Sequence, residues 1–440
     1  MKKIVVGFLL LMLIFTNVLL IDCGAKAKGE EVNLNNKTIT IWGGAHLSTV
    51  TEIVLKDFCA KHPGLKVICE KYPYAQYPTK MRLQLSAGEK VPDIMIIHDF
   101  IVPQFVKAGW LLDLTNKIPK KDLLDNFQAV SLKGKRYGVP NQSSTVSLMY
   151  RKDLFERFNL KAPATFDEYL KTAQFLKQKG YFIDAYDPSR DAHTLYLTFV
   201  YLLGGEVFDK TGKVILDTNA GKGVQALQML KKVVDMKVLH TSQSYMSDAY
   251  WTAFNNGEIA SLLGPSYIAS YFDTNMDPKG KGGYGAWRMT LPPHMGTFGP
   301  KTYQPGTEYY VINKRSAEPA AAWKVIEYLT QTVEAGQKFT EVNKQGTMVR
   351  MTNSYIPSLK NLEMKSYQWP IFGNQMLLSD VAKTLIETHA KIPYSYGDVR
   401  TEEMQRIIDT ELGAFFANKN ASVPKTIQEI AKKIRDIQID

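Results

Sequence analysis

Polar side chains follow two apolar segments of the sequence, at positions where ligand contacts are expected. Residues 38–42 alternate as a short strand and lead into a turn at 43–46, and the apolar segment 93–97 is followed by His98 and Asp99. In open α/β sheets, residues at the carboxyl ends of the strands contact ligands. Asp99 can accept hydrogen bonds from a polar ligand there, or it can cap the helix that follows.

The familiar catalytic and phosphate-binding motifs are absent from the sequence. It contains no HExxH, GxSxG or GxxxxGK[ST] motif, and the Gly-Lys pair at 212–213 is followed by Val214. That pair therefore lacks the hydroxyl that binds magnesium in a phosphate loop. Asp191 and His193 could form an acid/base pair, although two polar residues at a helix start are usually a cap. We expect a protein that is not an enzyme and has no cofactor.

The three cysteines indicate no metal site. No CxxC pair exists, which argues against a cysteine zinc site. Cys59 and Cys69 could pair in an exported chain, or both could be small buried residues.

The N-terminus has the layout of an export signal. Lys2 and Lys3 precede an apolar run over 4–21, which ends at Asp22 and Cys23. Residues 24–36 are polar and rich in Lys and Glu, as in a flexible tether. The alternative is an uncleaved membrane helix, because the run is near the lower length limit for spanning.

Length and charge suggest two lobes and argue against nucleic-acid binding. The chain has 440 residues, more than one compact core usually holds. Its net charge is +11, but the lysines are spread along helical segments instead of forming a stripe. This pattern is typical of solvated faces, and it also suits work beside an anionic membrane.

Hydrophobic periodicity predicts alternating strands and helices, which must position these side chains. An extended segment over 139–150 suggests that the chain leaves one lobe for another. Thr165 and Glu168 have the spacing of a capping box. The expected helices cover 47–61, 77–87, 152–179 in two pieces, 193–203, 219–236, 248–255, 319–329, 333–344, 398–419 and 426–437, and the expected strands lie at 38–42, 93–97, 259–263 and around Trp287.

Six motifs in order resemble the family 1 extracellular solute-binding proteins of ABC importers, the group that includes maltose-binding protein. The resemblance extends from residue 38 onward. The motifs are PDI at 92–94, GWLLDL at 109–114, YGVP at 137–140 with LMYRKDLF at 148–155, GG at 204–205 with Phe208 and TGK at 211–213, FNNGEIA at 254–260 with GP at 264–265, and AAAW at 320–323 with IEYL at 326–329.

This resemblance implies an α/β, two-lobed periplasmic-binding-protein-like fold of type II. Three crossings join the lobes, and the ligand lies in the cleft between them. The implied first lobe is 37–143 plus 307–350, and the second is 144–306 plus 351–440. The segment 20–23 looks like a bacterial lipoprotein box, with residues 1–23 as signal peptide and Cys23 as the lipidated residue, although Asp22 departs from that pattern.

The resemblance also implies the ligand-binding residues, because aromatic platforms and polar groups suit a sugar. The candidates are Trp42, Gly44, His46, His98, Asp99, Gln142, Ser144, Asp191, His193, Ser266, Tyr267, Tyr303, Thr307, Trp369 and Tyr396. Trp42 could instead be core. Many relatives carry Trp where this chain has Ser266, so Tyr267 or Trp369 supplies the platform, or the ligand is less sugar-like.

The implied function is the substrate-binding component of an ABC import system. It would be a monomer anchored to the outer face of the membrane by an N-terminal lipid, and it would deliver a sugar or oligosaccharide to permease subunits. The alternative is a secreted carbohydrate-active enzyme that uses Asp99 with Asp191.

Overall fold

The computed structural model describes most of the chain after the N-terminal segment. The described residues are 32–73, 76–88, 91–118, 131–132, 134–141, 145–241, 245–296, 302–303, 305–306, 308–340, 355, 357–358, 360, 371 and 393–438. The chain divides into two compact units, Met1–Asn33 and Leu34–Asp440. Only residues 32 and 33 of the first unit are among those described.

Five strands form the first sheet within Leu34–Asp440, in the order β2-β1-β3-β12-β6. These strands are β1 (Thr38–Gly44), β2 (Lys66–Tyr72), β3 (Ile94–His98), β6 (Gly138–Pro140) and β12 (Glu308–Ile312). β1 pairs in parallel with β2 and β3, whereas β12 is antiparallel to β3 and β6. All of β12 and four of the five residues of β3 are buried, as expected for central strands with both faces covered.

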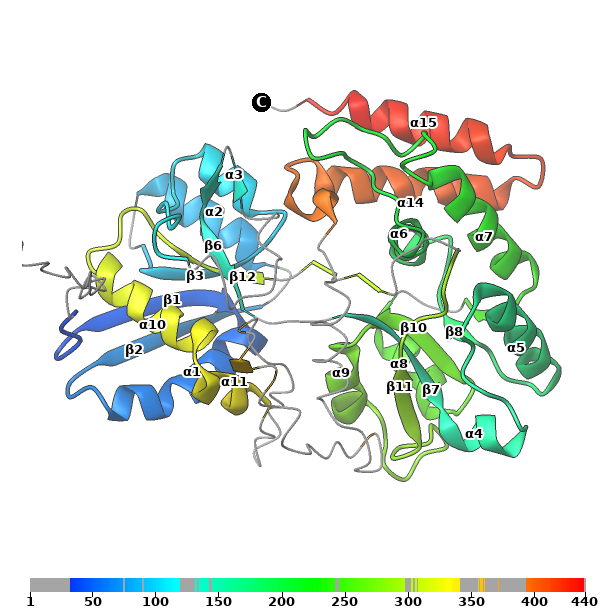
Figure 1. Cartoon of the computed structure of the whole chain (residues 1–440), viewed down its shortest axis with the longest axis horizontal. Coiled ribbons are helices and arrows are strands. Elements are labelled where there is room, and N and C mark those ends of the chain that lie inside the picture. The colour runs from blue at the N-terminus through cyan, green and yellow to red at the C-terminus, as the bar shows by residue number, and fades with distance from the viewer. Residues whose placement is uncertain are drawn as a thin grey trace, which may run out of the picture. The chain divides into compact units, whose positions relative to one another are not determined.

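Helices cover both faces of this sheet, and together they form the first lobe. The helices are α1 (Ala45–Ala60), α2 (Tyr77–Ala87), α3 (Val102–Lys107), α10 (Pro319–Gln331) and α11 (Val333–Thr340). α1 contacts β1, β2, α10 and α11, and α2 and α3 lie on the opposite face (Figure 1). Gly88 ends α2 with a φ of 73°, a left-handed conformation that glycine adopts without strain.

A smaller antiparallel sheet, in the order β10-β7-β11, is the centre of the second lobe. Its strands are β7 (Val146–Arg151), β10 (Ser261–Pro265) and β11 (Trp287–Thr290). Val146 and Leu148 belong to one apolar cluster and Met149 to another, because successive strand residues point to opposite faces. The sheet therefore separates two cores.

Helices of the second lobe fill these two cores. The first cluster contains side chains of α4 (Lys152–Arg157), α5 (Phe166–Gln178), α6 (Ala192–Leu202), α7 (Gly223–Asp235), α14 (Thr401–Ala417) and α15 (Val423–Arg435). The second contains side chains of α8 (Asp248–Asn255) and α9 (Ile268–Asn275). The C-terminal helices α14 and α15 thus pack on α6 and α7 (Figure 1).

The remaining described elements are short. They are the hairpin β4 (Ser131–Leu132) and β5 (Lys135–Arg136), the parallel pair β8 (Asp184–Ala185) and β9 (Leu239–His240), and the 3-10 turn η3 (Tyr394–Gly397).

Most predicted elements are present, with boundaries shifted by a few residues. The predicted helix over 248–255 is confirmed residue for residue as α8. Sequence patterns missed β12, which returns to the first sheet, and α9, which follows β10. Cys59 and Cys69 are both free and half-buried, so the structure contains neither a disulfide between them nor two fully buried thiols.

A capping interaction fixes the start of α5, as the spacing of Thr165 and Glu168 predicts. The Thr165 hydroxyl accepts a hydrogen bond from the Glu168 amide at 3.3 Å. In return, the Glu168 carboxylate accepts one from the Ala164 amide at 2.7 Å. The two contacts satisfy amides that have no partner within the helix.

Replacing Thr165 with alanine is expected to destabilise the second lobe modestly. Thr165→Ala leaves the Glu168 amide without its partner and should lower the free energy of unfolding by about 1 kcal/mol. Urea denaturation measures the change. Thr252→Ala, at an exposed position inside α8, is the control and should change stability by less than about 0.5 kcal/mol. Equal losses in the two variants would contradict the capping role.

Candidate functional site

A buried carboxyl group lies where β3 ends and β12 begins. The register of the two antiparallel strands places Glu308 opposite His98. Glu308 is only 4% exposed, and its Oε1 accepts a hydrogen bond from the Tyr77 hydroxyl at 2.7 Å. His98 Nε2 lies 3.8 Å from the same oxygen. Two strands and one helix therefore hold a single acidic group at the carboxyl end of the first sheet.

Burial shifts both titratable groups toward their neutral forms. It raises the pKa of Glu308 to about 7, although the hydrogen bond from Tyr77 opposes the shift. It lowers the pKa of His98 to about 4. The imidazole is thus uncharged at pH 7, and the carboxyl is poised between its two protonation states.

Asp99 lies beside this pair and is in contact with a residue of η3. Its side chain accepts a hydrogen bond from the Phe100 amide at 2.9 Å, and the residue is 1% exposed. A Cβ atom on Gly306 would lie 2.4 Å from Asp99 Oδ2 and 2.3 Å from Tyr396 Cδ1. Only glycine leaves room for the chain to pass between these two side chains.

Tyrosines of the second lobe lie near these carboxyl groups. Burial and then the Glu308 carboxylate raise the pKa of Tyr271, and Glu308 also acts on Tyr267 after burial and the neighbouring tyrosines. Asp99 contributes in the same way to the raised pKa of Tyr396, behind burial and two tyrosines. These interactions require close approach, so both lobes contribute to one cluster.

We call this cluster the tyrosine–carboxyl site. It comprises Asp99, Glu308, Tyr267, Tyr271, Tyr303 and Tyr396. Tyr303 is held by a hydrogen bond of 3.1 Å between its hydroxyl and that of Thr198, and its ring lies 5.1 Å from that of Tyr201. The site combines aromatic faces with acidic hydrogen-bond acceptors.

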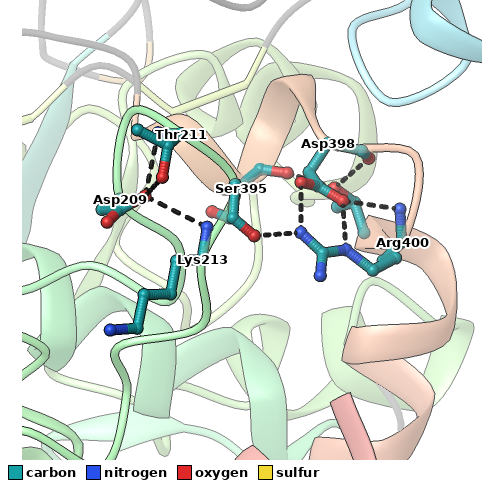
Figure 2. A network of polar contacts seen from close by, with 8 residues as sticks. Asp209, Thr211, Lys213, Ser395, Asp398 and Arg400 are labelled. Carbon is teal, nitrogen blue, oxygen red and sulfur yellow. Dashed lines mark hydrogen bonds and ion pairs between the residues drawn. The ribbon is translucent and has the colours of Figure 1, made fainter. Parts of the chain in front are cut away.

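A polar network holds the turn that carries Tyr396 (Figure 2). Arg400 donates from Nε and Nη2 to the two oxygens of Asp398, both at 2.8 Å. It also donates to the carbonyl of Gly212 at 2.5 Å and lies over the ring of Phe208, 4.2 Å from its centre. The network thereby ties the end of η3 to a hairpin of the second lobe.

Three further hydrogen bonds support this arrangement. Asp209 Oδ1 accepts hydrogen bonds from the Thr211 amide at 2.8 Å and the Lys213 amide at 3.0 Å, which stiffens the hairpin (Figure 2). Ser395, within η3, shares a short hydrogen bond with the Tyr201 hydroxyl. Tyr396 therefore sits on a rigid support.

Three predicted residues of the first lobe lie around the end of β1. Trp42 is buried at 1% exposure and packs edge-to-face with Tyr72, 5.8 Å away. Its Nε1 has no hydrogen-bond partner among the described residues. Gly44 precedes α1 directly and is buried, and His46 is in the first turn of α1, where only its backbone is described.

Three predicted residues of the second lobe are engaged by neighbours. His193 pairs with Asp409 of α14, with Nδ1 2.8 Å from Oδ2, instead of with Asp191. Asp191 accepts a hydrogen bond from the Tyr245 amide at 2.8 Å. Ser266 Oγ accepts one from the Thr145 amide at 3.2 Å. The imagined acid/base pair of Asp191 and His193 is therefore absent.

The other predicted residues fall on unplaced parts of the chain. Gln142, Ser144, Thr307, Trp369 and Cys23 lie outside the described residues.

Sequence analysis missed Glu308, Tyr77 and Tyr271. The sequence does contain one relevant feature: the apolar segment Glu308–Ile312 begins with a charged residue, which is unusual for a central strand. This feature indicates a site only when the pairing of the segment with β3 is known. Asp99 does not cap α3, whose N-cap residue is Ile101 and has no side-chain cap.

The described residues hold no group of three or more His, Cys, Asp or Glu side chains that could bind a metal ion. Among the same residues, no helix is both long and apolar enough to cross a membrane.

A family model describes most of the region that contains this site. The model for bacterial extracellular solute-binding proteins matches residues 43–335, about two thirds of the chain. The chain belongs to this family. The predicted family is thereby confirmed, and it is a family of extracellular solute-binding proteins, not of catalysts.

Named relatives include two sugar-binding proteins. The arabinooligosaccharide-binding protein of Bacillus subtilis (strain 168) is 29% identical over 295 residues, which are 64% of this chain and 66% of that protein. This chain thus covers just under two thirds of that relative's length. The lactose-binding protein of Rhizobium radiobacter is 23% identical over 430 residues, 94% of this chain and 93% of that protein.

Solved structures confirm the fold class. Maltose-bound T. maritima MalE3 matches with a TM-score of 0.69 at 23% identity, over 90% of this chain and 99% of that one. The family member described here thus has the two-lobed α/β periplasmic-binding-protein fold. Three crossings between the lobes were predicted. The chain makes two of them, at 140–146 and at 302–308. The predicted third crossing lies outside the described residues.

The raised pKa of Glu308 predicts a pH-dependent stability. The folded protein binds more protons than the unfolded chain between pH 4.5 and about 7, so this group makes stability fall as pH rises through that window. Between pH 4 and 8, Glu308→Gln should therefore gain about 3 kcal/mol relative to wild type, as measured by urea denaturation.

His98 has the opposite effect on the pH dependence of stability, and it has this effect in both wild type and Glu308→Gln. Its lowered pKa makes stability rise between pH 4 and 6.5, and the comparison of wild type with Glu308→Gln removes this contribution. Glu327→Gln, a half-exposed position on α10, is the control and should parallel wild type. A Glu308→Gln profile that also parallels wild type would contradict the shifted pKa.

Proposed function

We propose that this chain is the extracellular substrate-binding component of an ABC import system, which captures a sugar or oligosaccharide and releases it unchanged to a membrane permease. The observation that carries the proposal is the tyrosine–carboxyl site in a solute-binding family member. Two relatives, an arabinooligosaccharide-binding protein and a lactose-binding protein, support the choice of ligand class.

The chemistry of the site suits a saccharide. Sugar rings have apolar faces that pack against aromatic rings, and hydroxyl groups around the rim that need fixed acceptors and donors. Tyr267 and Tyr271 supply aromatic faces at the start of α9. Asp99 and Glu308 supply acceptors from the first lobe.

The contacts of Asp191 support binding without turnover. A glycosidase needs two carboxyl groups on opposite sides of one glycosidic bond. Asp191, the proposed partner of Asp99 in the enzyme alternative, is instead engaged by the Tyr245 amide. We infer that the bound saccharide leaves chemically intact, without any cofactor.

The two lobes are inferred to close over the ligand. We propose the lobe boundaries given by the family resemblance, 37–143 plus 307–350 and 144–306 plus 351–440. Because the site draws residues from both lobes, a bound saccharide would bridge them and stabilise a closed form that the permease can distinguish.

We also infer that the protein acts as a monomer attached to the outer face of the cell membrane. Residues 1–23 would form the signal peptide and lipoprotein box, Cys23 would carry the lipid as the first residue of the mature chain, and 24–36 would be the tether. Such an anchor keeps the loaded protein near its permease subunits.

Saccharide binding should depend on the ring of Tyr267. Isothermal titration calorimetry with arabinotriose, lactose and maltotriose should give saturable binding of at least one of them. Tyr267→Ala should weaken that binding about tenfold, because it removes a stacking face. Tyr181→Ala makes the same change elsewhere in the second lobe and should leave affinity unchanged. Absence of binding by wild type to all three saccharides would contradict the proposal.

Lipidation should depend on Cys23. Expression of the full chain in a bacterial host should yield a membrane-bound protein whose intact mass corresponds to a chain that begins at a lipidated Cys23. Cys23→Ser should release the protein from the membrane fraction. A mature protein that retains Met1 would overturn the anchor.

A further inference from the structure

We propose that Glu308 is a specificity-determining contact of the tyrosine–carboxyl site: its Oε2 accepts a hydrogen bond from a hydroxyl of an uncharged saccharide, and its carboxyl disfavours saccharides that carry a carboxylate. This inference rests on the proposed function and assigns the ligand class.

The backbone and one hydrogen bond orient the Glu308 side chain. β12 pairs with β3 on one side and with β6 on the other, so the first residue of β12 is fixed in register. Tyr77 of α2 then holds Oε1 at 2.7 Å. A preorganised acceptor loses little entropy when a ligand binds.

The second carboxyl oxygen of Glu308 has no hydrogen-bond partner in the part of the chain that the structure describes. Glu308 Oε2 makes no hydrogen bond to any described residue, and its side chain is only 6% exposed. The described atoms that are fully buried without a hydrogen-bond partner do not include Oε2, so this oxygen is accessible from outside the protein. A ligand hydroxyl can therefore reach it and donate a hydrogen bond to it.

Asp184 shows what a purely structural buried carboxyl looks like in this protein. It is 2% exposed, and its two oxygens accept hydrogen bonds from the amides of Ala185 at 2.7 Å and Leu263 at 2.9 Å. Both acceptors are satisfied by the backbone. Glu308 differs because one of its oxygens is left for another molecule.

Groups of both lobes lie near Glu308. Tyr267 and Tyr271 of the second lobe are close enough for the charge of Glu308 to contribute to the raised pKa of both phenols. His98 and Tyr77 face it from the first lobe, at Oε1. The first lobe occupies Oε1, so Oε2 is the oxygen that remains for a saccharide held against the tyrosines.

Charge then determines which saccharides fit. Among the described residues, only His98 lies within ion-pair distance of Glu308, and its buried imidazole is neutral at pH 7. A ligand carboxylate placed against Glu308 would meet like charge or force the acid to keep its proton. An uncharged hydroxyl meets neither cost, so the site discriminates by repulsion as well as attraction.

Calorimetry on two Glu308 variants of the full chain tests the inference. The probes are arabinotriose, lactose, maltotriose and the anionic trigalacturonate, at pH 8. Glu308→Ala should weaken the best-bound neutral saccharide about tenfold to a hundredfold, as expected for loss of a hydrogen bond to a charged group. Glu308→Gln keeps the shape without the charge. It should lower the ratio of the trigalacturonate Kd to the neutral Kd at least fivefold, an order-of-magnitude expectation for removing one like charge.

Glu327→Gln is the matched control and should change neither quantity, and thermal melts verify that each variant is folded. Unchanged neutral affinity in Glu308→Ala, or an unchanged Kd ratio in Glu308→Gln, overturns this inference while leaving the proposed function standing. A wild type that binds none of the neutral saccharides overturns the proposed function, and this inference with it.

Discussion

The pairing of β12 with β3 is the constraint on which the site depends. β12 starts at residue 308, more than two hundred residues after β3, yet it inserts between β3 and β6 with Glu308 opposite His98. The segment between β6 and β12 therefore leaves and re-enters the first sheet at the same end of its strands. Everything built in between, including the β10-β7-β11 sheet, is attached at the carboxyl end of β3, where Asp99 lies.

That attachment explains why aromatic and acidic groups meet. The first lobe contributes Glu308 and Asp99 from strand ends, and the second contributes tyrosines from the start of α9 and from η3. A saccharide site needs both sets, because the two carboxyl groups offer no apolar face and the tyrosines offer no carboxylate acceptor. The hydrogen bonds of Arg400 hold the turn that carries Tyr396 (Figure 2). The pairing of β12 with β3 and β6 holds Glu308.

Local sequence patterns predicted most of the fold, because helices such as α5 and α8 have apolar residues at helical spacing and a capping residue at the start. The register of β12 could not be predicted, since it depends on a partner strand far away in the sequence. For the same reason the sequence pointed to Asp99, which directly follows an apolar strand, but not to Glu308. His193 pairs with Asp409 of α14 and not with Asp191, and that partner lies more than two hundred residues away. Long-range pairing decides such cases, and one sequence does not reveal it.

We propose that the two lobes close around a saccharide that stays intact. Small-angle X-ray scattering of the full chain, with and without a saturating amount of the neutral saccharide that binds best, measures this closure directly. The account predicts a smaller radius of gyration in the bound state and quantitative recovery of the unaltered saccharide. Identical scattering in both states, or recovery of a cleaved saccharide, would contradict it.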